Sequence, residues 1–286
     1  MSKCLIPVVL CTLFLLASCS GPVSRTMIPQ PSQETRAASA GWHGGRPWID
    51  QHLDGVKIAA GGPLDLLFLG DSITQSWGGR GRQVGSPAAA VLEKWFSRLK
   101  VGNLGISGDR TQHLLWRIEN GALDGADPSA IVILIGTNNI THDPPADIAR
   151  GIEAVVEAAR IAAPDSRIIL HPIFPRGKTA EDPGRQDVMA TNARIQPLAR
   201  LAGVEILDLE EVFLGTDQMA RSDLYRGDYL HLSPAGYEAW ARALVPRLEA
   251  IGLTVPVQQC PAITDQKKRH IRVDPDVALD STIARD

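Results

Sequence analysis

Short apolar runs alternate along the middle of the chain with longer stretches in which apolar residues recur every three or four positions. The first pattern is typical of buried strands and the second of helices that cover a sheet. The expected strands are 64–69, 101–104, 131–135, 167–173 and 204–207. The expected helices are 88–99, 111–118, 147–162, 187–201 and 234–250. This alternation predicts an α/β fold in which helices cover both faces of a parallel sheet.

The first nineteen residues have the pattern of an export signal. Lys3 precedes an apolar stretch over 5–16, which is too short to span a membrane, and small residues follow it. Leu16-Ala17-Ser18-Cys19 resembles the bacterial lipobox, in which the cysteine becomes the acylated first residue of the mature protein. That resemblance implies a membrane-anchored lipoprotein facing the periplasm or the cell exterior. The alternative is an ordinary signal peptide with an incidental cysteine, and either interpretation predicts export.

Polar segments flank the part of the chain in which apolar runs and helical stretches alternate. Residues 20–45 are rich in Pro, Ser, Thr and Gln without apolar periodicity, which predicts a flexible tether. Residues 254–286 are polar, aperiodic and interrupted by prolines, and they predict a disordered tail. The folded domain is therefore expected at 46–253. Cys260 lies in the tail, where we expect a spare thiol without a role.

Length and charge narrow the possible functions. A chain of 286 residues with 44% hydrophobic content can bury one sizeable core, and nothing in its length requires two domains. The formal net charge is -3, and the longest basic cluster is Lys267–Arg269. Such a chain lacks the positive field that attracts phosphate backbones, so nucleic acid is not an expected partner.

Three expected strands end in turns that carry chemically useful groups. Gly70-Asp71-Ser72 follows the first strand, Asn103-Leu104-Gly105 ends the second, and Gly136-Thr137-Asn138 follows the third. Ligands of parallel α/β sheets bind outside the carboxyl ends of the strands, so these turns are expected to meet at one site.

A serine in such a turn needs a base to become a nucleophile, and the base needs a group that orients it. Asp228-Tyr229-Leu230-His231 supplies both just before the last expected helix. We therefore expect a catalytic triad of Ser72, His231 and Asp228. The amides of Ser72 and Gly105 and the side chain of Asn138 are the expected oxyanion donors. Taken singly, Ser72 would also fit a helix cap, and Asn138 and Asp228 would also fit turn residues.

These blocks, in this order, resemble the four that define SGNH/GDSL hydrolases. A closer similarity, to the catalytic subunits of platelet-activating-factor acetylhydrolase and related bacterial esterases, is carried by Gly105–Thr111, Leu115-Trp116-Arg117, Gly136–Asn139, Pro175-Arg176-Gly177 and Tyr229–Leu232. The resemblance implies a flavodoxin-like, three-layer α/β/α sandwich with a five-stranded parallel sheet. It also implies ester hydrolysis without metal or other cofactor, and a preference for short acyl groups such as acetyl. Ile73 stands where the GDSL motif has leucine, which affects the wall of the site more than its chemistry.

Residues close to these motifs are candidates for the substrate pocket. They are Asp71, Ile73, Trp77, Thr137 and Leu230. Trp77 suits either stacking on a sugar ring or a hydrophobic cap. Asp109 and Arg110 are expected to form a structural pair, and the role of Arg176 stays open.

Export favours an acetylated carbohydrate or a related substrate outside the cytoplasm. The alternatives are a lipid-active lysophospholipase or thioesterase, and a non-catalytic glycan-binding lipoprotein. Acyl-chain preference separates the acetyl esterase from the lipid-active enzyme, because a pocket closed after two carbons rejects long acyl chains.

Overall fold

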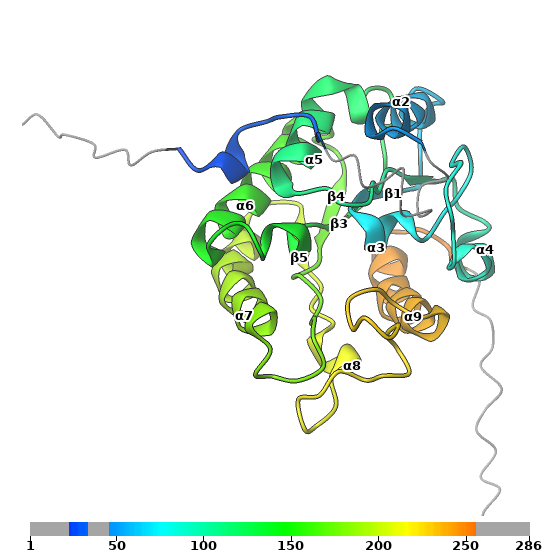
Figure 1. Cartoon of the computed structure of the whole chain (residues 1–286). Coiled ribbons are helices and arrows are strands. Elements are labelled where there is room, and N and C mark those ends of the chain that lie inside the picture. The colour runs from blue at the N-terminus through cyan, green and yellow to red at the C-terminus, as the bar shows by residue number, and fades with distance from the viewer. Residues whose placement is uncertain (1–22, 34–45, 256–286) are drawn as a thin grey trace, which may run out of the picture. The chain divides into compact units, whose positions relative to one another are not determined.

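Five parallel strands form the centre of the computed structural model, which describes residues 23–33 and 46–255 (Figure 1). The strands are β1 (Leu66–Gly70), β2 (Val101–Asn103), β3 (Ala130–Leu134), β4 (Arg167–Leu170) and β5 (Val204–Ile206). Their order is β2-β1-β3-β4-β5, and every neighbouring pair is parallel. This order places a topological switch point between β1 and β3, where ligands bind in such folds.

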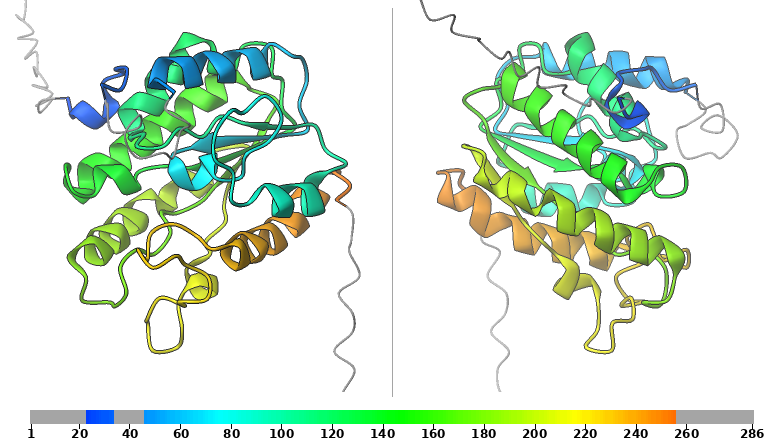
Figure 2. Two further views of the ribbon diagram at one scale, coloured as in Figure 1. Left: turned by 45° about the vertical axis from the view of Figure 1, so that its right-hand side comes forward. Right: turned by 90° about the vertical axis from the view of Figure 1, so that its left-hand side faces the viewer.

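Helices cover both faces of this sheet (Figure 2). One face packs against α5 (Thr111–Arg117), α6 (Pro145–Ala162) and α7 (Pro183–Ile195). The other face packs against α4 (Ala89–Phe96), α8 (Glu210–Phe213) and α9 (Pro234–Ala250). The predicted three-layer α/β/α fold is therefore confirmed. The remaining helical elements are η1 (Arg25–Met27), α2 (Trp48–Ala59), α3 (Ser72–Gln75), η2 (Ile118–Ala122), η3 (Thr137–Asn139) and η4 (Gln196–Arg200).

The side chains of β1 show how one strand serves two cores. Leu67 and Leu69 join the apolar cluster under α5 and α6, while Leu66 and Phe68 join the cluster under α4 and α9. All four are fully buried, as expected for a strand with helices on both sides. Strands that are buried on both faces appear in the sequence as continuous apolar runs. For this reason, all five strands lie at or within a few residues of their predicted positions.

Helix α2 was not predicted, and its composition explains why. Its exposed side carries Ile49 and Leu53, whereas its buried side includes Gln51, His52 and Gly55. Apolar and polar residues therefore occur on both sides of this helix, unlike in an ordinary surface helix. A search for apolar periodicity passes over such a helix.

The segment 23–33 also differs from its prediction as part of a flexible tether. Residues Arg25–Met27 form one 3₁₀ turn, and Thr26 within it is fully buried. This turn contacts α5 and α6, so part of the expected tether belongs to the folded domain. Hydrogen bonds rather than apolar burial hold it, which is why composition gave no sign of it.

Several predictions lie outside the described residues. They are the export signal with Cys19, the remainder of the expected tether at 34–45, and the tail beyond residue 255 with Cys260. None of the helices in the described part of the chain is both long enough and apolar enough to cross a membrane.

Candidate active site

Ser72 lies where β1 passes into the short helix α3. Gly70 ends the strand, and a Cβ there would lie 2.2 Å from the carbonyl oxygen of Leu134, so only glycine fits this exit. Asp71 caps α3 by accepting a hydrogen bond from the amide of Ile73 at 2.9 Å. Ser72 is therefore the first residue of the helix and not its cap. Its hydroxyl is left for another partner.

That partner is His231. The Ser72 Oγ lies 3.0 Å from His231 Nε2, and His231 Nδ1 lies 2.7 Å from Asp228 Oδ2. The three predicted residues thus form one continuous relay, although Ser72 and His231 are 159 positions apart in the chain. The relay has the arrangement of a nucleophile, a base and a group that orients the base.

Asp228 fixes the protonation pattern of this relay. Its Oδ1 accepts the amides of Leu230 at 3.0 Å and His231 at 2.9 Å, so the carboxylate also shapes the turn. Partial burial raises the pKa of Asp228, but the hydrogen bonds from the His231 ring and from these amides outweigh it and hold the pKa below its ordinary value. An ionised carboxylate only accepts hydrogen bonds, so the ring carries its proton on Nδ1. In the neutral ring with its proton on Nδ1, Nε2 is the nitrogen whose lone pair can accept the Ser72 hydroxyl.

Gly105 has a different task from the one predicted. Its amide donates to Asn103 Oδ1 at 2.9 Å, and a Cβ at this position would lie 2.3 Å from the amide nitrogen of Gln75. Gly105 therefore allows the turn after β2 to pack against α3. The prediction that its amide binds the oxyanion is corrected here, because that amide already serves Asn103.

Gly108, three residues further on, has the geometry that was expected of Gly105. A 3.1 Å hydrogen bond from Asp109 to the carbonyl of Ile106 closes the turn, and Gly108 within it has a φ of +80°. No atom lies within 4 Å of the position that a Cβ would take. Among residues 23–33 and 46–255, none accepts a hydrogen bond from its amide. The sequence offered two glycines in this turn and no signal to choose between them.

Asn138 lies in η3, directly after β3. Its Nδ2 donates to the carbonyl oxygen of Asp109 at 2.9 Å, which ties η3 to the turn that contains Gly108. Arg176, whose role was open, donates to the carbonyl oxygen of Thr137 at 2.9 Å. Thr137 is thus buried, and its carbonyl oxygen anchors η3 to Arg176. The turns after β2 and β3 are held together as predicted.

The family model for the GDSL-like lipase/acylhydrolase family matches residues 68–239, which contain all of these groups. The chain belongs to this family. It is accordingly a serine hydrolase that cleaves esters. The predicted family resemblance and enzyme class are confirmed.

Named relatives of this acylhydrolase include subunits of platelet-activating factor acetylhydrolase IB. The alpha2 subunit of Rattus norvegicus is 35% identical over 193 residues, which are 66% of this chain and 78% of the relative. The alpha1 subunit of Pongo abelii is 32% identical over 231 residues, covering 79% and 90%.

Solved structures show the same fold at lower identity. An acetylxylan esterase from Geobacillus stearothermophilus, solved as a catalytic mutant, has a TM-score of 0.52 and 23% identity over 68% of this chain and 96% of its own. A GDSL-like lipase from Bacteroides thetaiotaomicron has a TM-score of 0.53 and 18% identity over 75% and 96%.

Buried charges lie beneath the nucleophile of this acylhydrolase. Asp109 is fully buried and pairs with Arg117 at 2.7 Å, not with Arg110 as predicted. Arg110 instead lies 2.9 Å from His142 Nε2 at the surface.

Arg117 also donates to the carbonyl oxygens of Leu104 and Gly70, which joins the ends of β2 and β1. Burial raises the pKa of Asp109 to about 6, although Arg117 opposes the shift.

Asp71 is the second buried carboxyl group of the site. Burial raises its pKa to about 7, and the hydrogen bond from the Ile73 amide only partly offsets this. Its position next to the nucleophile is as predicted, but its carboxylate supports α3 from below.

Two further candidates for the substrate pocket belong to the core instead. Trp77 is fully buried, with ring centroids 4.8 Å from Tyr237 and 5.2 Å from Trp240. The hydrophobic interpretation of Trp77 is therefore the right one, and sugar stacking is not available to it. Ile73 is 2% exposed and packs in the same cluster. Leu230 is half-buried beside His231 and stays a candidate for the pocket.

Proposed function

We propose that this chain is a short-acyl O-esterase in which Ser72, His231 and Asp228 form the catalytic triad. The relay of 3.0 Å and 2.7 Å contacts carries the proposal, because it couples a serine hydroxyl to an imidazole and the imidazole to a carboxylate. Ser72 Oγ attacks the acyl carbonyl while His231 Nε2 takes its proton. The same proton then passes to the leaving alcohol, and water releases the acyl group from Ser72 in a second cycle of the same steps.

We propose the amides of Ser72 and Gly108 and the Nδ2 of Asn138 as the oxyanion donors. Ser72 begins α3, where a helix leaves its first amides without intrahelical acceptors. Gly108 replaces Gly105 in this role because its amide is not used within the described structure. Each donor of this kind contributes about 10²- to 10³-fold to the rate.

For the natural substrate, we propose an acetyl ester of a carbohydrate or a related compound outside the cytoplasm. Two observations support this choice. Relatives above 30% identity are named acetylhydrolases, and a solved structure with the same fold is named an acetylxylan esterase. The predicted export signal and lipidation at Cys19 would place the enzyme where such glycans occur.

The test is hydrolysis of p-nitrophenyl acetate, butyrate and octanoate by the wild-type chain, by Ser72→Ala and by the control Ser97→Ala. Ser97 is an exposed serine after α4. We expect the acetate to be the best substrate, and a loss of at least about 10⁴-fold in kcat only in Ser72→Ala. Acetate release from acetylated xylo-oligosaccharides then tests the carbohydrate directly.

Three other results would contradict parts of this proposal. Preference for octanoate would contradict a short-acyl pocket and favour a lipid ester as substrate. Equal rates for wild type and Ser72→Ala would contradict the triad. A wild-type protein inert on all three esters would favour the glycan-binding alternative.

A further inference from the structure

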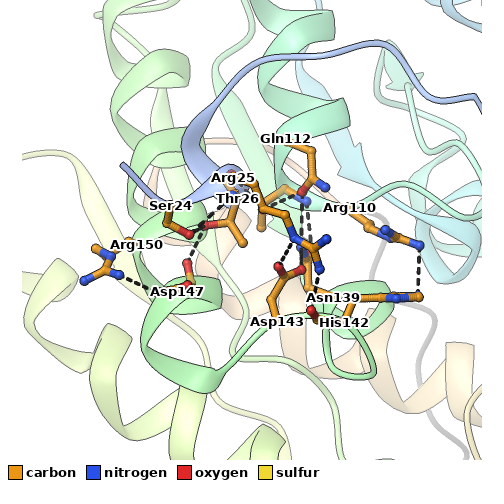
Figure 3. A network of polar contacts seen from close by, with 11 residues as sticks. Ser24, Arg25, Thr26, Arg110, Gln112, Asn139, His142, Asp143, Asp147 and Arg150 are labelled. Carbon is orange, nitrogen blue, oxygen red and sulfur yellow. Dashed lines mark hydrogen bonds and ion pairs between the residues drawn. The ribbon is translucent and has the colours of Figure 1, made fainter. Parts of the chain in front are cut away.

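A short N-terminal strap, Ser24–Gln30, lies against helices α5 and α6 (Figure 3). The buried Thr26 holds it in place. The Thr26 hydroxyl donates to the carbonyl oxygen of Asp147 at 2.6 Å, and the Thr26 carbonyl accepts from Thr111 Oγ1 at 3.0 Å. The amide of Gln30 donates to the carbonyl oxygen of Gln112. The strap is thus hydrogen-bonded to both α5 and the start of α6.

Helix α6 leaves room for this contact. A Cβ at Gly151 would lie 2.5 Å from Thr111 Oγ1 and 2.9 Å from the Cβ of Thr26. A larger residue at this position would push the strap away from the domain. The glycine therefore permits the close approach of the strap, at the cost in helix propensity that a mid-helix glycine brings.

Arg25 of the strap reaches the loop that carries the proposed oxyanion donor. Its Nε lies 2.5 Å from Asp143 Oδ1, and its guanidinium also donates to the carbonyl oxygen of His142. The Asp143 side chain is 2% exposed, so Arg25 neutralises a buried carboxylate. Removing one partner of such a pair leaves an uncompensated charge.

Asp143 passes this contact on to Asn139. Asp143 Oδ2 accepts from Asn139 Nδ2 at 3.0 Å, and Asn139 Oδ1 accepts from the amide of Thr111 at 3.0 Å (Figure 3). Asn139 is fully buried and directly follows Asn138 in η3. A contiguous chain of hydrogen bonds therefore leads from Arg25 to the residue next to the oxyanion donor.

We propose that Arg25 is a positioning residue for ester hydrolysis. Through Asp143 and Asn139 it fixes η3, and with it the direction of the Asn138 side chain. This inference rests on the proposed role of Asn138 in the oxyanion hole. The opposite end of η3 is fixed independently, because Arg176 holds Thr137.

A double-mutant cycle in the full chain tests this role. Arg25→Gln, Asn138→Ala and the double variant are compared with wild type on p-nitrophenyl acetate. We expect Arg25→Gln to lower kcat about 3- to 10-fold with little change in KM, which is part of the 10²- to 10³-fold effect of one oxyanion donor. In the Asn138→Ala background, the same substitution is expected to change kcat by less than about twofold, because the group that it positions is gone.

Two further variants serve as controls for the cycle. Arg150→Gln is the matched control, since Arg150 forms a neighbouring surface ion pair with Asp147 that does not reach Asp143. It should leave kcat unchanged. Arg25→Lys keeps the positive charge and should recover most of the lost rate. If Arg25→Gln yields no folded protein, Arg25→Lys takes its place in the cycle, with a smaller loss that again depends on Asn138.

The inference fails if Arg25→Gln lowers kcat equally in both backgrounds, since that result describes a general loss of structure. It also fails if Arg25→Gln has no effect on kcat in the wild-type background. If Asn138→Ala itself is fully active, the oxyanion assignment falls and this inference with it. The triad would still stand on the separate result for Ser72→Ala.

Discussion

The two halves of the catalytic relay are built in different ways. The serine half, at the ends of β1 and β2, is enclosed: Ser72 is 6% exposed, and Asp71 and Asp109 are buried below it. The histidine half lies on the loop between α8 and α9, where the Asp228 side chain is 44% exposed. Tyr229 between the two relay residues has a φ of +49°, a conformation unusual for a residue other than glycine.

The forces that hold the two halves differ accordingly. The serine half is fixed by strand pairing, by the buried Arg117 and by the hydroxyl of Tyr237, which donates to the carbonyl oxygen of Ile73 at 2.7 Å. The histidine half is fixed by local hydrogen bonds, such as the 2.8 Å contact from the Arg226 amide to the His231 carbonyl. Changes in the buried groups that support Ser72 should therefore cost mainly stability, and changes in the exposed groups that orient His231 should cost mainly rate.

The largest effect is expected from Asp228→Asn in the histidine half. Asparagine has no charge to stabilise the imidazolium and can favour the wrong tautomer of His231, so kcat should fall about 10⁴-fold. Because the side chain is nearly half exposed, the melting temperature should change little. Kinetics and thermal unfolding, with the exposed Asp223→Asn as control, measure both quantities. A large loss of stability with a small loss of rate would contradict this view of the loop.

Arg117→Met in the serine half should show the reverse balance. It removes three interactions and leaves the carboxylate of Asp109 buried without its ion pair. We expect a loss of about 3–5 kcal/mol in the free energy of unfolding. Urea denaturation measures it, with Arg160→Met as control, since Arg160 pairs with Glu157 at the surface. Equal losses of unfolding free energy in both variants would show that the buried Arg117–Asp109 pair does not stabilise the serine half more than a surface ion pair does.

Asp71→Asn should have the smallest effect, and one that depends on pH. The pKa of Asp71 is raised to about 7 in the folded protein, whereas an aspartate in the unfolded chain titrates near pH 4. Between these values the folded protein keeps a proton that the unfolded chain has lost. Wild-type stability should therefore fall as pH rises from about 4 to about 7 and then level off.

Asparagine still offers an oxygen to the Ile73 amide but does not titrate. The fall in stability over this range should be smaller in Asp71→Asn by about 1–3 kcal/mol. Some slope should remain, since the pKa of Asp109 is raised in the same direction. Urea denaturation at several pH values measures the difference, and the exposed Asp124→Asn serves as control. Identical slopes in wild type and Asp71→Asn would contradict the proposed proton.

The sequence predicted best where one kind of interaction dominates. Buried parallel strands are continuous apolar runs, so their positions could be found directly. Helix α9 matches its predicted bounds of 234–250 because Ser233 caps it and Pro234 occupies its first position. The triad could be predicted because nucleophile, base and carboxylate each require a particular residue type.

The sequence predicted poorly where tertiary contacts decide the role of a residue. Gly105 and Gly108 look alike in the chain, and only the packing of Gln75 and the hydrogen bond to Asn103 separate them. Trp77 follows the nucleophile in sequence but points into the core. Asp109 pairs with Arg117 rather than its neighbour Arg110 because Arg117, about two helical turns further along α5, shares its buried environment.

If Cys19 carries a lipid as proposed, the docked strap limits how far the enzyme can lie from the membrane. A free segment over residues 20–45 would give the domain a reach of up to about 90 Å when extended. With Ser24 already bound to the domain, only five chain steps separate it from Cys19, and they span at most about 18 Å. A lipid on Cys19 would therefore hold the hydrolase almost against the bilayer, with the strap side facing the lipids.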